Sequence, residues 1–461
     1  MESFTETKDR REKKKMQYVP KRGGQRGGAS SGKLSQTNSK TEDVAMTEEE
    51  PQSSQSSLRS SQPTRHGAAA SRGPKLHEEE KKGGHGPKQS HRPSTEEGFT
   101  GDKETWFDDI SFKKQLIQDL TYLDQKHDYY FGSYSHFYIH EEMLKDKVRT
   151  NAYRQAIEGN KDDFKDKIVL DIGAGTGILS IFAARAGAKH VYAVENAEIA
   201  YFAREIIKKN GLESKITVLK GKMEEIELPV PQVDIIISEW MGYFLLYESM
   251  LDSVLWARDK YLNKQGGKML PDRAQIFIAG IEDEQYKWNK EHFWRDQYGV
   301  DMSIMTNVSL KEPCIDYLNA FENPNDRDAI VTNKCKIVDL DLVHMNKGDV
   351  NFAAAYNLNV NKNSKVSAII AWFDCHFENL KNKVVLSTSP YEYYTHWKNT
   401  IFYLDKAQTV DQGDSLKGSV AVRQSKENFR ELDVKFSFHF NAKNPVINPV
   451  IAPYTQLYKV R

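Results

Sequence analysis

The sequence contains little cysteine, with three residues among 461, at Cys314, Cys335 and Cys375. An odd number of widely spaced cysteines provides neither a disulfide framework nor the close pairs of a zinc site, which favours a reducing compartment. Apolar runs are also short, and none approaches the roughly 20 residues that a membrane-spanning helix needs. The N-terminal residues have no apolar segment, which argues against a secretory signal. We therefore expect a soluble intracellular protein without a metal site.

Charge of one sign is not in excess, because 65 lysines and arginines are balanced by 65 aspartates and glutamates. Such a chain is not a polycation, and we expect no membrane partner and no direct nucleic-acid binding by the folded part. Aromatic residues are scarce before residue 100, where only Phe4, Tyr18 and Phe99 occur, and all seven tryptophans lie from Trp106 onward. Residues 1–100 cannot bury enough apolar surface to offset the entropy of ordering, so a disordered tail is predicted.

Two short runs in this tail have more than one reading. The basic run RREKKK at 10–15 fits a nuclear import signal, but also a segment that only solvates the tail. The run RGGQRGG at 22–28 exposes two arginines on flexible backbone, which suits RNA contact, entry into an active site that modifies arginine, or a plain linker. The expected location is the nucleus and the cytoplasm.

From residue 167 the chain alternates between strand and helix patterns. This alternation predicts a doubly wound parallel sheet, whose ligand binds at the carboxyl ends of the strands. The helices are expected at 178–186 and up to about 210. The strands are expected at 168–170, 190–194, 216–219 and 233–237.

A glycine-rich loop follows the first of these strands, with glycines at Gly173, Gly175 and Gly177. Glycines let a backbone turn sharply and approach a ligand closely. Glu195 ends the second strand, where an acidic residue can accept hydrogen bonds from ribose hydroxyls. These features fit a dinucleotide or S-adenosylmethionine, but the G-x-G-x-G spacing differs from the dinucleotide pattern and favours S-adenosylmethionine.

Two carboxylates, Glu239 and Glu248, bracket a mostly apolar and aromatic loop after the fourth strand. The ordinary reading is a pair of surface glutamates. Because the residues between them are apolar, the loop is expected to pack, and a packed carboxylate needs a cationic partner. The loop itself contains no basic residue, which leaves room for a ligand cation. A guanidinium fits, since it is planar, permanently charged and offers paired N–H donors to carboxylates.

From about residue 124 onward the chain resembles the protein arginine N-methyltransferases of type I, most closely the predominant type I enzyme of eukaryotes. The resemblance implies methyl transfer from S-adenosyl-L-methionine to arginine, giving monomethyl and asymmetric dimethylarginine on histone tails and RGG-type RNA-binding proteins. Symmetric or mono-only methylation, and a scaffold without catalysis, are the alternatives. The resemblance rests on YFGSY at 130–134, HEEMLKD at 140–146 with Arg149, VLDIGAGTG at 169–177, GKMEE at 221–225, SEWMGYFLLYE at 238–248 and THW at 395–397.

The resemblance also implies roles for individual residues. On the cofactor, Arg149 would pair with the carboxylate, and Glu195 would bind the ribose. Each role has a plainer alternative, such as packing for Met143 or an ordinary hydrogen-bonded histidine for His396. The implied cofactor-binding residues are Tyr134, His140, Met143, Arg149, Asp171, Gly173, Gly175, Glu195, Met223 and Glu224. The implied catalytic residues are Glu239 and Glu248, which would hold the guanidinium, and Asp146 with His396, a pair that could carry the proton away.

Two positions depart from the family pattern. Gly132 stands where an aspartate is usual, and Tyr138 stands where a small glycine is common. Both fall in the N-terminal segment that is expected to close over the cofactor. We expect Gly132 to loosen this lid and Tyr138 to change its packing, which affects cofactor affinity and substrate preference but not the reaction.

Beyond about residue 271 the pattern changes to strands. Residues 432–440 alternate apolar and polar, which predicts a half-buried antiparallel strand, and similar runs occur near 364–377 and 395–404. An antiparallel barrel or sandwich is therefore expected at 271–461, and the resemblance implies a barrel, after helices and a cofactor domain at 101–270. An aromatic helical stretch at about 284–305 would be a dimerisation arm by resemblance, and we predict a head-to-tail homodimer or a higher oligomer. The polar stretch 319–328 is predicted to be a surface loop.

Overall fold

The computed structural model describes Lys103, Trp106 and residues 129–446 and 449–461. The tail predicted at 1–100, with its basic and RGG runs, lies outside the described residues. Within them, no helix is both long and apolar enough to cross a membrane. The same part of the chain contains no group of three or more histidine, cysteine or acidic side chains placed to hold a metal ion.

The first part of the fold is a five-stranded parallel sheet with the strand order β3-β2-β1-β4-β5. Every neighbouring pair in this sheet is parallel, so the predicted doubly wound arrangement is confirmed. The inner strands are buried on both faces and consist largely of Ile, Val, Leu and Ala, as parallel strands covered by helices require. The strands are β1 (Ile168–Ile172), β2 (His190–Glu195), β3 (Ile216–Lys220), β4 (Ile235–Ser238) and β5 (Lys268–Leu270).

Helices pack against this sheet and precede it. The helix α6 (Ile199–Lys209) shows the pattern: it buries Ile199, Ala203 and Ile207 at helical spacing and turns its charged residues outward. A short 3-10 helix, η2 (Met223–Glu225), follows β3. The other helices of this part are α1 (Tyr129–Ser133), α2 (Phe137–Lys145), α3 (Lys147–Glu158), α4 (Lys161–Phe164), α5 (Ile178–Arg185) and α7 (Leu251–Tyr261).

The second part consists of two antiparallel sheets whose inner faces share one hydrophobic core, which confirms the predicted antiparallel barrel. The first sheet has the order β7-β12-β10-β6-β8, with β11 paired to β10, and the second has the order β15-β14-β13-β9. The strands are β6 (Arg273–Ile281), β7 (Cys314–Asp316), β8 (Cys335–Asp341), β9 (Phe352–Asn359), β10 (Ser364–Phe377), β11 (Val384–Ser387), β12 (Asn399–Val410), β13 (Ser415–Gln424), β14 (Leu432–Asn441) and β15 (Tyr454–Val460).

The strand β14 is not half-buried as predicted, because its polar residues are covered as well. Lys435 is 1% exposed, and its Nζ donates to the backbone oxygen of Trp106 at 3.1 Å. Asp433 accepts from Arg423 at 3.0 Å on the neighbouring strand. A partner on the neighbouring strand and one 329 positions away thus contact polar side chains on a face that the alternating pattern predicts to be exposed to solvent.

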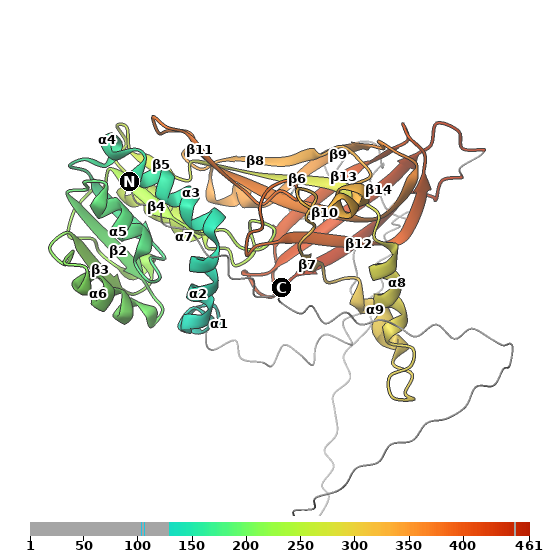
Figure 1. Ribbon diagram of the computed structural model, residues 1–461, viewed down its shortest axis with the longest axis horizontal. Coiled ribbons are helices and arrows are strands. Elements are labelled where there is room, and N and C mark those ends of the chain that lie inside the picture. Colours follow the sequence, from blue (N-terminus) through green and yellow to red (C-terminus); the bar gives the residue numbers. More distant parts are fainter. Residues whose placement is uncertain (1–102, 104–105, 107–128, 447–448) are drawn as a thin grey trace, which may run out of the picture. The chain divides into compact units, whose positions relative to one another are not determined.

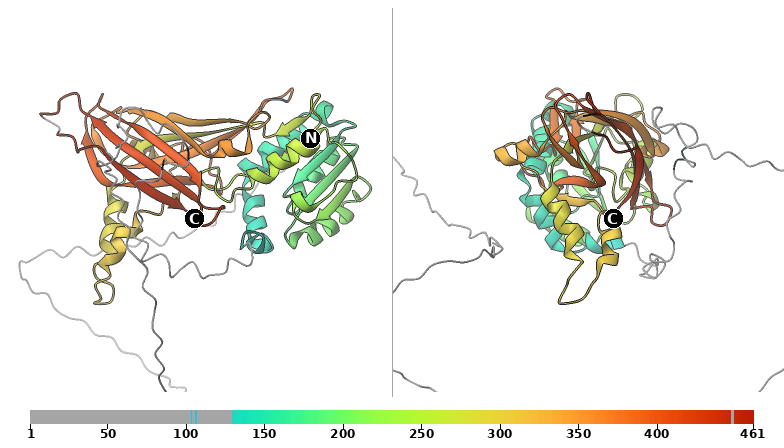
Figure 2. Two further views of the ribbon diagram at one scale, coloured as in Figure 1. Left: turned by 180° about the vertical axis from the view of Figure 1, so that it is seen from behind. Right: turned by 90° about the vertical axis from the view of Figure 1, so that its right-hand side faces the viewer.

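The segment between β6 and β7 forms the predicted aromatic arm. It contains α8 (Glu284–Phe293), η3 (Ser303–Met305) and α9 (Thr306–Ser309), and it projects from the antiparallel sheets (Figures 1 and 2). Trp288, Phe293 and Tyr298 on this arm are exposed.

Two other expectations are wrong in detail. Residues 319–328 are not simply a loop, because they run into α10 (Pro324–Ala329), and residues 395–397 precede β12 instead of beginning it. Short boundary errors of this kind are expected where propensity alone sets the ends. A 3-10 helix, η4 (Lys347–Val350), precedes β9.

Candidate active site

A pocket lies at the carboxyl ends of β1, β2 and β4, where ligands bind in open parallel sheets. It is lined by α1, α2, the glycine loop, the end of β2, η2, the acidic loop after β4 and Arg430 from the β13–β14 connection. Asp171, Asp146 and His396 do not line it. The other predicted site residues all do: Tyr134, His140, Met143, Arg149, Gly173, Gly175, Glu195, Met223, Glu224, Glu239 and Glu248.

The glycine loop adopts a backbone that other residues rarely adopt. Gly173, Gly175 and Gly177 have φ angles of +70°, +54° and +81°. A Cβ on Gly173 would collide with Met250, and one on Gly175 would lie 3.2 Å from the Nδ1 atom of His140. The loop therefore forms a close-fitting floor for the pocket that any side chain at these positions would fill.

His140 closes over this floor from α2. Its Nε2 lies 2.8 Å from the backbone oxygen of Tyr134, so Nε2 donates and Nδ1 carries the lone pair. Burial lowers the pKa of His140, and the nearby positive charge of Arg149 acts in the same direction. The imidazole is thus neutral at physiological pH, and a buried neutral ring covers the glycine loop.

Glu195 ends β2 with both carboxylate oxygens turned toward backbone donors. Oε2 accepts from the Gly175 N–H at 2.9 Å, and Oε1 accepts from the Ala197 N–H at 2.7 Å. Burial raises the pKa of Glu195. Each oxygen has a further lone pair, so this carboxylate can accept from paired hydroxyls while it holds the loop.

Asp171 lies beneath the loop, as a support. The Ser180 hydroxyl donates to its Oδ2 at 2.6 Å, and burial raises the pKa of Asp171 to about 7. At the other end of the pocket, Met223 is buried in η2, and Glu224 accepts a hydrogen bond of 2.5 Å from the Ser253 hydroxyl. An apolar side chain and a carboxylate therefore adjoin each other beyond Glu195, opposite the acidic loop.

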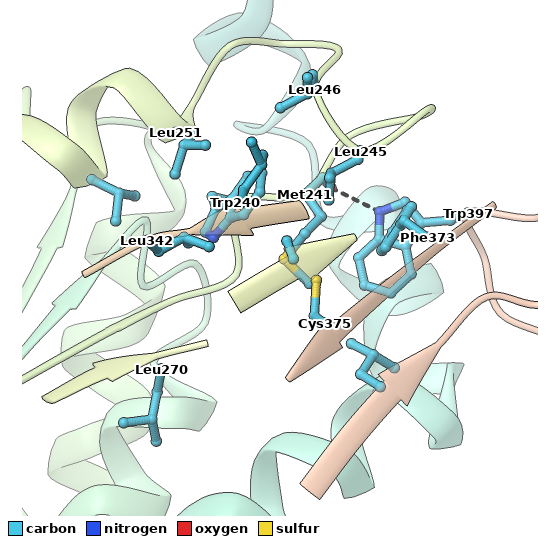
Figure 3. Close-up of a cluster of buried hydrophobic side chains, with 14 of the residues drawn as sticks. Trp240, Met241, Leu245, Leu246, Leu251, Leu270, Leu342, Phe373, Cys375 and Trp397 are labelled. Carbon is cyan, nitrogen blue, oxygen red and sulfur yellow. Dashed lines mark hydrogen bonds between the residues drawn. The ribbon is translucent and has the colours of Figure 1, made fainter. Parts of the chain in front are cut away.

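The acidic loop after β4 has an unusual backbone that packing holds in place. Phe244, Leu245, Glu248 and Ser249 all have positive φ angles, between 51° and 76°. Such conformations cost free energy at residues other than glycine and persist only where the surroundings enforce them. The enforcing contacts come from buried apolar side chains and from Trp397, whose indole N–H donates to the backbone oxygen of Met241 at 2.7 Å (Figure 3).

Glu239 is already paired with a cation. The Nε and Nη2 atoms of Arg149 lie 2.8 and 2.7 Å from its Oε2, and both side chains are 8% exposed. The predicted vacancy is therefore wrong for this glutamate, because α3 supplies an arginine that is 90 residues away in the sequence. In this structure the guanidinium of Arg149 pairs with Glu239. When a ligand carboxylate enters the pocket, the guanidinium can pair with Glu239, with the ligand carboxylate, or with both.

Glu248 differs from Glu239. The Tyr134 hydroxyl donates to its Oε2 at 3.1 Å, and within the described residues no lysine, arginine or histidine forms an ion pair with its carboxylate. Burial raises the pKa of Glu248 to about 7, and the negative charge of Glu239 adds to this effect. Of the two glutamates that were predicted to bind a ligand cation, Glu248 is therefore the one whose carboxylate can accept it.

The predicted pair of Asp146 and His396 is present, but it lies outside the pocket lining. Oδ2 of Asp146 is 2.8 Å from Nδ1 of His396 and accepts from the His396 backbone N–H at 2.9 Å. Oδ1 accepts from the Arg149 N–H at 2.9 Å, which caps the N-terminus of α3. Burial favours the protonated acid, but hydrogen bonds from His396 and Arg149 lower the pKa of Asp146 below its usual value. His396 holds the Asp146 carboxylate, and Asp146 caps the first turn of α3. The pair therefore helps to set the position of Arg149 on that turn.

Arg430 was not predicted. One of its guanidinium nitrogens donates to the backbone oxygen of Glu248 at 2.7 Å, and its own backbone oxygen accepts from the Glu248 N–H at 2.8 Å. Its guanidinium carbon lies 4.0 Å from the centre of the Tyr130 ring. The residue is on a hairpin 182 positions away from Glu248, so no local pattern identifies it.

The two departures in the lid have modest structural effects. No atom lies within 4 Å of the place where a Cβ on Gly132 would stand. Tyr138 is 64% exposed, and its effect on the packing of the lid stays a prediction.

The chain matches two known families. Residues 272–443 match the arginine methyltransferase oligomerization subdomain, and residues 150–248 match the ribosomal protein L11 methyltransferase family. It is 51% identical to Protein arginine N-methyltransferase 1 of Schizosaccharomyces pombe over 323 residues, which cover 70% of this chain and 93% of the relative. It is 49% identical to Probable protein arginine N-methyltransferase 1.2 of Arabidopsis thaliana over 334 residues, 72% of this chain and 88% of that protein.

Solved structures agree with these matches. The Trypanosoma brucei PRMT1 enzyme–prozyme heterotetrameric complex with AdoHcy has 41% identity and a TM-score of 0.66, covering 71% of this chain and 100% of its own. Arabidopsis thaliana protein arginine methyltransferase 10 has 32% identity and a TM-score of 0.64, covering 72% of this chain and 100% of its own.

Proposed function

Because this chain belongs to the protein arginine N-methyltransferases, we propose that it is a type I member, which makes monomethyl and asymmetric dimethylarginine. Membership makes it an enzyme that transfers methyl groups from S-adenosyl-L-methionine to arginine side chains of proteins. The observation that carries the proposal for the site is Glu248, a carboxylate without an ion pair among the described residues, in the pocket that also contains the glycine loop.

The pocket fits the cofactor by the shape of its floor and by the kind of its donors and acceptors. We assign to Gly173 and Gly175 the positions at which the cofactor lies closest to the backbone, because these residues have no side chain in the glycine loop. Glu195 would accept from the ribose hydroxyls, and Glu224 with Met223 would hold the adenine. When bound, S-adenosylmethionine supplies an electrophilic methyl group on a sulfonium. Arg149 would divide its donors between Glu239 and the cofactor carboxylate.

The acceptor side of the pocket suits a guanidinium. Glu248 would receive paired N–H donors of the substrate arginine, while Glu239, held by Arg149, orients the same group from the opposite side. Two fixed carboxylates hold the attacking nitrogen in line, which is a positioning contribution to catalysis. A guanidinium with a pKa above about 12 is not deprotonated beforehand, so its proton leaves during or after transfer. The approach of the cation lowers the pKa of Glu248 and restores its negative charge.

The type of product rests on Met143 and the acidic loop. Met143 lines the pocket from α2, next to the lid, where a bulky flexible side chain limits how a methylated guanidinium can turn. We infer asymmetric dimethylation from this placement and from the family pattern. Hydrolysis of a methylated peptide and mass spectrometry of the amino acids distinguish asymmetric from symmetric dimethylarginine. Monomethylarginine alone, or the symmetric product, would contradict the assignment.

We also propose partners of stated kinds. Histone tails and glycine–arginine-rich proteins are the expected substrates, since they expose arginines on flexible backbone. A homodimer through the arm is supported by exposed Trp288, Phe293 and Tyr298, which monomeric proteins rarely leave in water. A location in both nucleus and cytoplasm remains a proposal from the basic run at 10–15, outside the described residues.

The direct test uses radiolabelled S-adenosylmethionine and a glycine–arginine peptide. We expect label on the peptide, and a dimeric mass in solution. Calorimetry with the cofactor checks that the pocket is competent. Cofactor binding by a folded dimer that transfers no label to any arginine peptide would contradict the proposed substrate.

A further inference from the structure

Exposed aromatic side chains gather on a surface beside the acidic loop. We call it the tyrosine-rich surface and define it by the exposed residues Tyr243, Phe321, Tyr391, Tyr393 and Tyr394, together with the half-buried Tyr317. Tyr391, Tyr393 and Tyr394 are 41%, 59% and 48% exposed, and three of these rings stand in a run of four residues between β11 and β12. Exposed aromatic residues in one patch are unusual on a soluble protein and mark a contact site.

The rings are fixed by contacts with one another. Phe321 and Tyr393 pack edge to face with ring centres 4.8 Å apart, and Tyr317 and Tyr394 do so at 5.0 Å. The Tyr317 hydroxyl also donates to the Glu392 backbone oxygen at 3.0 Å, which joins the two loops. Edge-to-face pairs leave one ring face of each pair open, so a planar group can stack there without rearrangement.

The tyrosine-rich surface continues into the active site. Partial burial raises the pKa of Tyr243, on the acidic loop, and so do the charges of Glu248, Tyr394 and Glu142 in that order. The indole N–H of Trp397, three residues after Tyr394, donates to the backbone oxygen of Met241, two residues before Tyr243, at 2.7 Å, so the segment that carries Tyr394 contacts the acidic loop. Tyr394 is also directly followed by Thr395 and His396, and His396 is bonded to Asp146. Tyr243 stacks on Tyr247, the residue before Glu248, with ring centres 6.3 Å apart, so the tyrosine-rich surface adjoins the acidic loop.

The surface also carries negative charge. Asp316, Glu322 and Glu392 directly adjoin Tyr317, Phe321 and Tyr393 in the chain, and in the described residues none of these three carboxylates forms an ion pair. Arg327 also lies in this part of the chain, and its guanidinium donates to the backbone oxygens of Ala320 and Phe321 at 2.9 and 3.3 Å. Open aromatic faces among unpaired carboxylates attract cations, and arginine in particular, since its guanidinium both stacks and pairs.

We propose that the tyrosine-rich surface binds the flanking arginines of a glycine–arginine-rich substrate while the target arginine lies at Glu248. The inference rests on the proposed function and adds to it a second contact region that selects substrates with several arginines. Glycines between the arginines let the backbone follow the surface closely. Each exposed stacking contact adds a small stabilisation, and several together give a preference of about five- to tenfold.

The first experiment varies the peptide and leaves the enzyme unchanged. Three peptides share one central target arginine between glycines, and their two flanking positions are both arginine, both lysine or both glutamine. Methylation of the central arginine is followed by mass spectrometry, so extra sites do not confuse the rate. We expect KM to rise from arginine to lysine to glutamine, by about five- to tenfold in total, with kcat unchanged. Equal KM values for all three peptides would overturn the inference.

The second experiment varies the surface. The triple variant Phe321→Ser, Tyr391→Ser and Tyr393→Ser removes three rings that lie outside the pocket lining. KM for the arginine-flanked peptide should rise about fivefold, while the glutamine-flanked peptide should be unaffected. The matched control is Val385→Ser on β11, an exposed apolar residue outside the surface, which should change neither value.

The remaining outcomes are also decisive. If the triple variant raises KM equally for both peptides, or if it loses the dimer by mass in solution, the rings serve folding or self-association and the inference is wrong. If the triple variant does not fold, the peptide series alone decides. If the unaltered enzyme methylates none of the peptides, the proposed function fails instead. Methylation of all peptides with one KM leaves the proposed function intact and removes only the second contact region.

Discussion

The glycine loop and the acidic loop line the same pocket, but the groups that hold them come from very different distances along the chain. Gly175 donates to Glu195, 20 residues later, and Asp171 bonds Ser180 nine residues later. Glu239 is held by Arg149 over 90 residues, and Glu248 by Arg430 over 182. The cofactor side is therefore a local structure of one strand–loop–helix unit, whereas the acceptor side depends on the junction of the two parts of the fold.

The largest effect expected on the acceptor side comes from Glu248→Gln. The amide keeps the shape but loses the charge that attracts the guanidinium, so kcat/KM for a peptide should fall by roughly 10³-fold. Cofactor affinity should stay within about threefold, because the cofactor side is built separately. Steady-state kinetics and calorimetry measure the two. A comparable loss of cofactor affinity would show that the two sides are not independent.

Glu239→Gln should behave differently, because it leaves the buried guanidinium of Arg149 without a counter-charge. We expect a lower free energy of unfolding, by about 3 kcal/mol, together with weaker cofactor binding and lost activity. Urea unfolding of both glutamate variants tests the difference. Equal stability of the two would mean that the Arg149–Glu239 pair contributes little to the fold.

The cofactor side is tested by Gly173→Ala. The added methyl group would displace the terminal methyl of Met250, and it would strain a backbone whose φ of +70° residues other than glycine rarely adopt. Cofactor affinity should fall about tenfold, a cost of about 1 to 2 kcal/mol, while kcat at saturating cofactor changes little. Gly348→Ala, in η4 with no atom within 4 Å of the added carbon, is the control. A large fall in kcat with unchanged affinity would contradict a purely local role.

The same contrast explains what sequence could and could not reveal. The parallel sheet, the glycine loop and Glu195 follow from strand–helix alternation and short spacings, and they were predictable. Glu239 and Glu248 were also visible, but their unequal environments were not, because Arg149 and Arg430 reach them through tertiary structure. The prediction for β14 is wrong for a similar reason. The alternating pattern places Lys435 on an exposed face, but this side chain is 1% exposed and donates to the backbone oxygen of Trp106, 329 positions away.

A smaller effect on kcat/KM is expected from pH, and it concerns the ionisation of Glu248. Burial raises the pKa of Glu248 to about 7, and a protonated carboxyl does not attract a guanidinium. Below pH 7 the ionised fraction falls, so kcat/KM for peptide should drop about tenfold between pH 8 and pH 6. Binding of the cofactor alone should lack this inflection near pH 7. A flat profile for the peptide would show that Glu248 is fully ionised throughout.

The smallest effect expected concerns Arg430, whose positive charge acts to lower the pKa of Glu248. Arg430→Met removes that charge and the hydrogen bond to the Glu248 backbone but keeps an apolar chain against the Tyr130 ring. The inflection in kcat/KM should move to higher pH, which reduces activity about threefold at pH 7 and hardly at pH 9. Arg430→Lys should restore most of the difference, since it returns the charge. If the loss is the same at every pH and lysine does not rescue it, then Arg430 acts through packing on Tyr130 alone. The acceptor side would in that case depend on the antiparallel part for its shape and not for its charge.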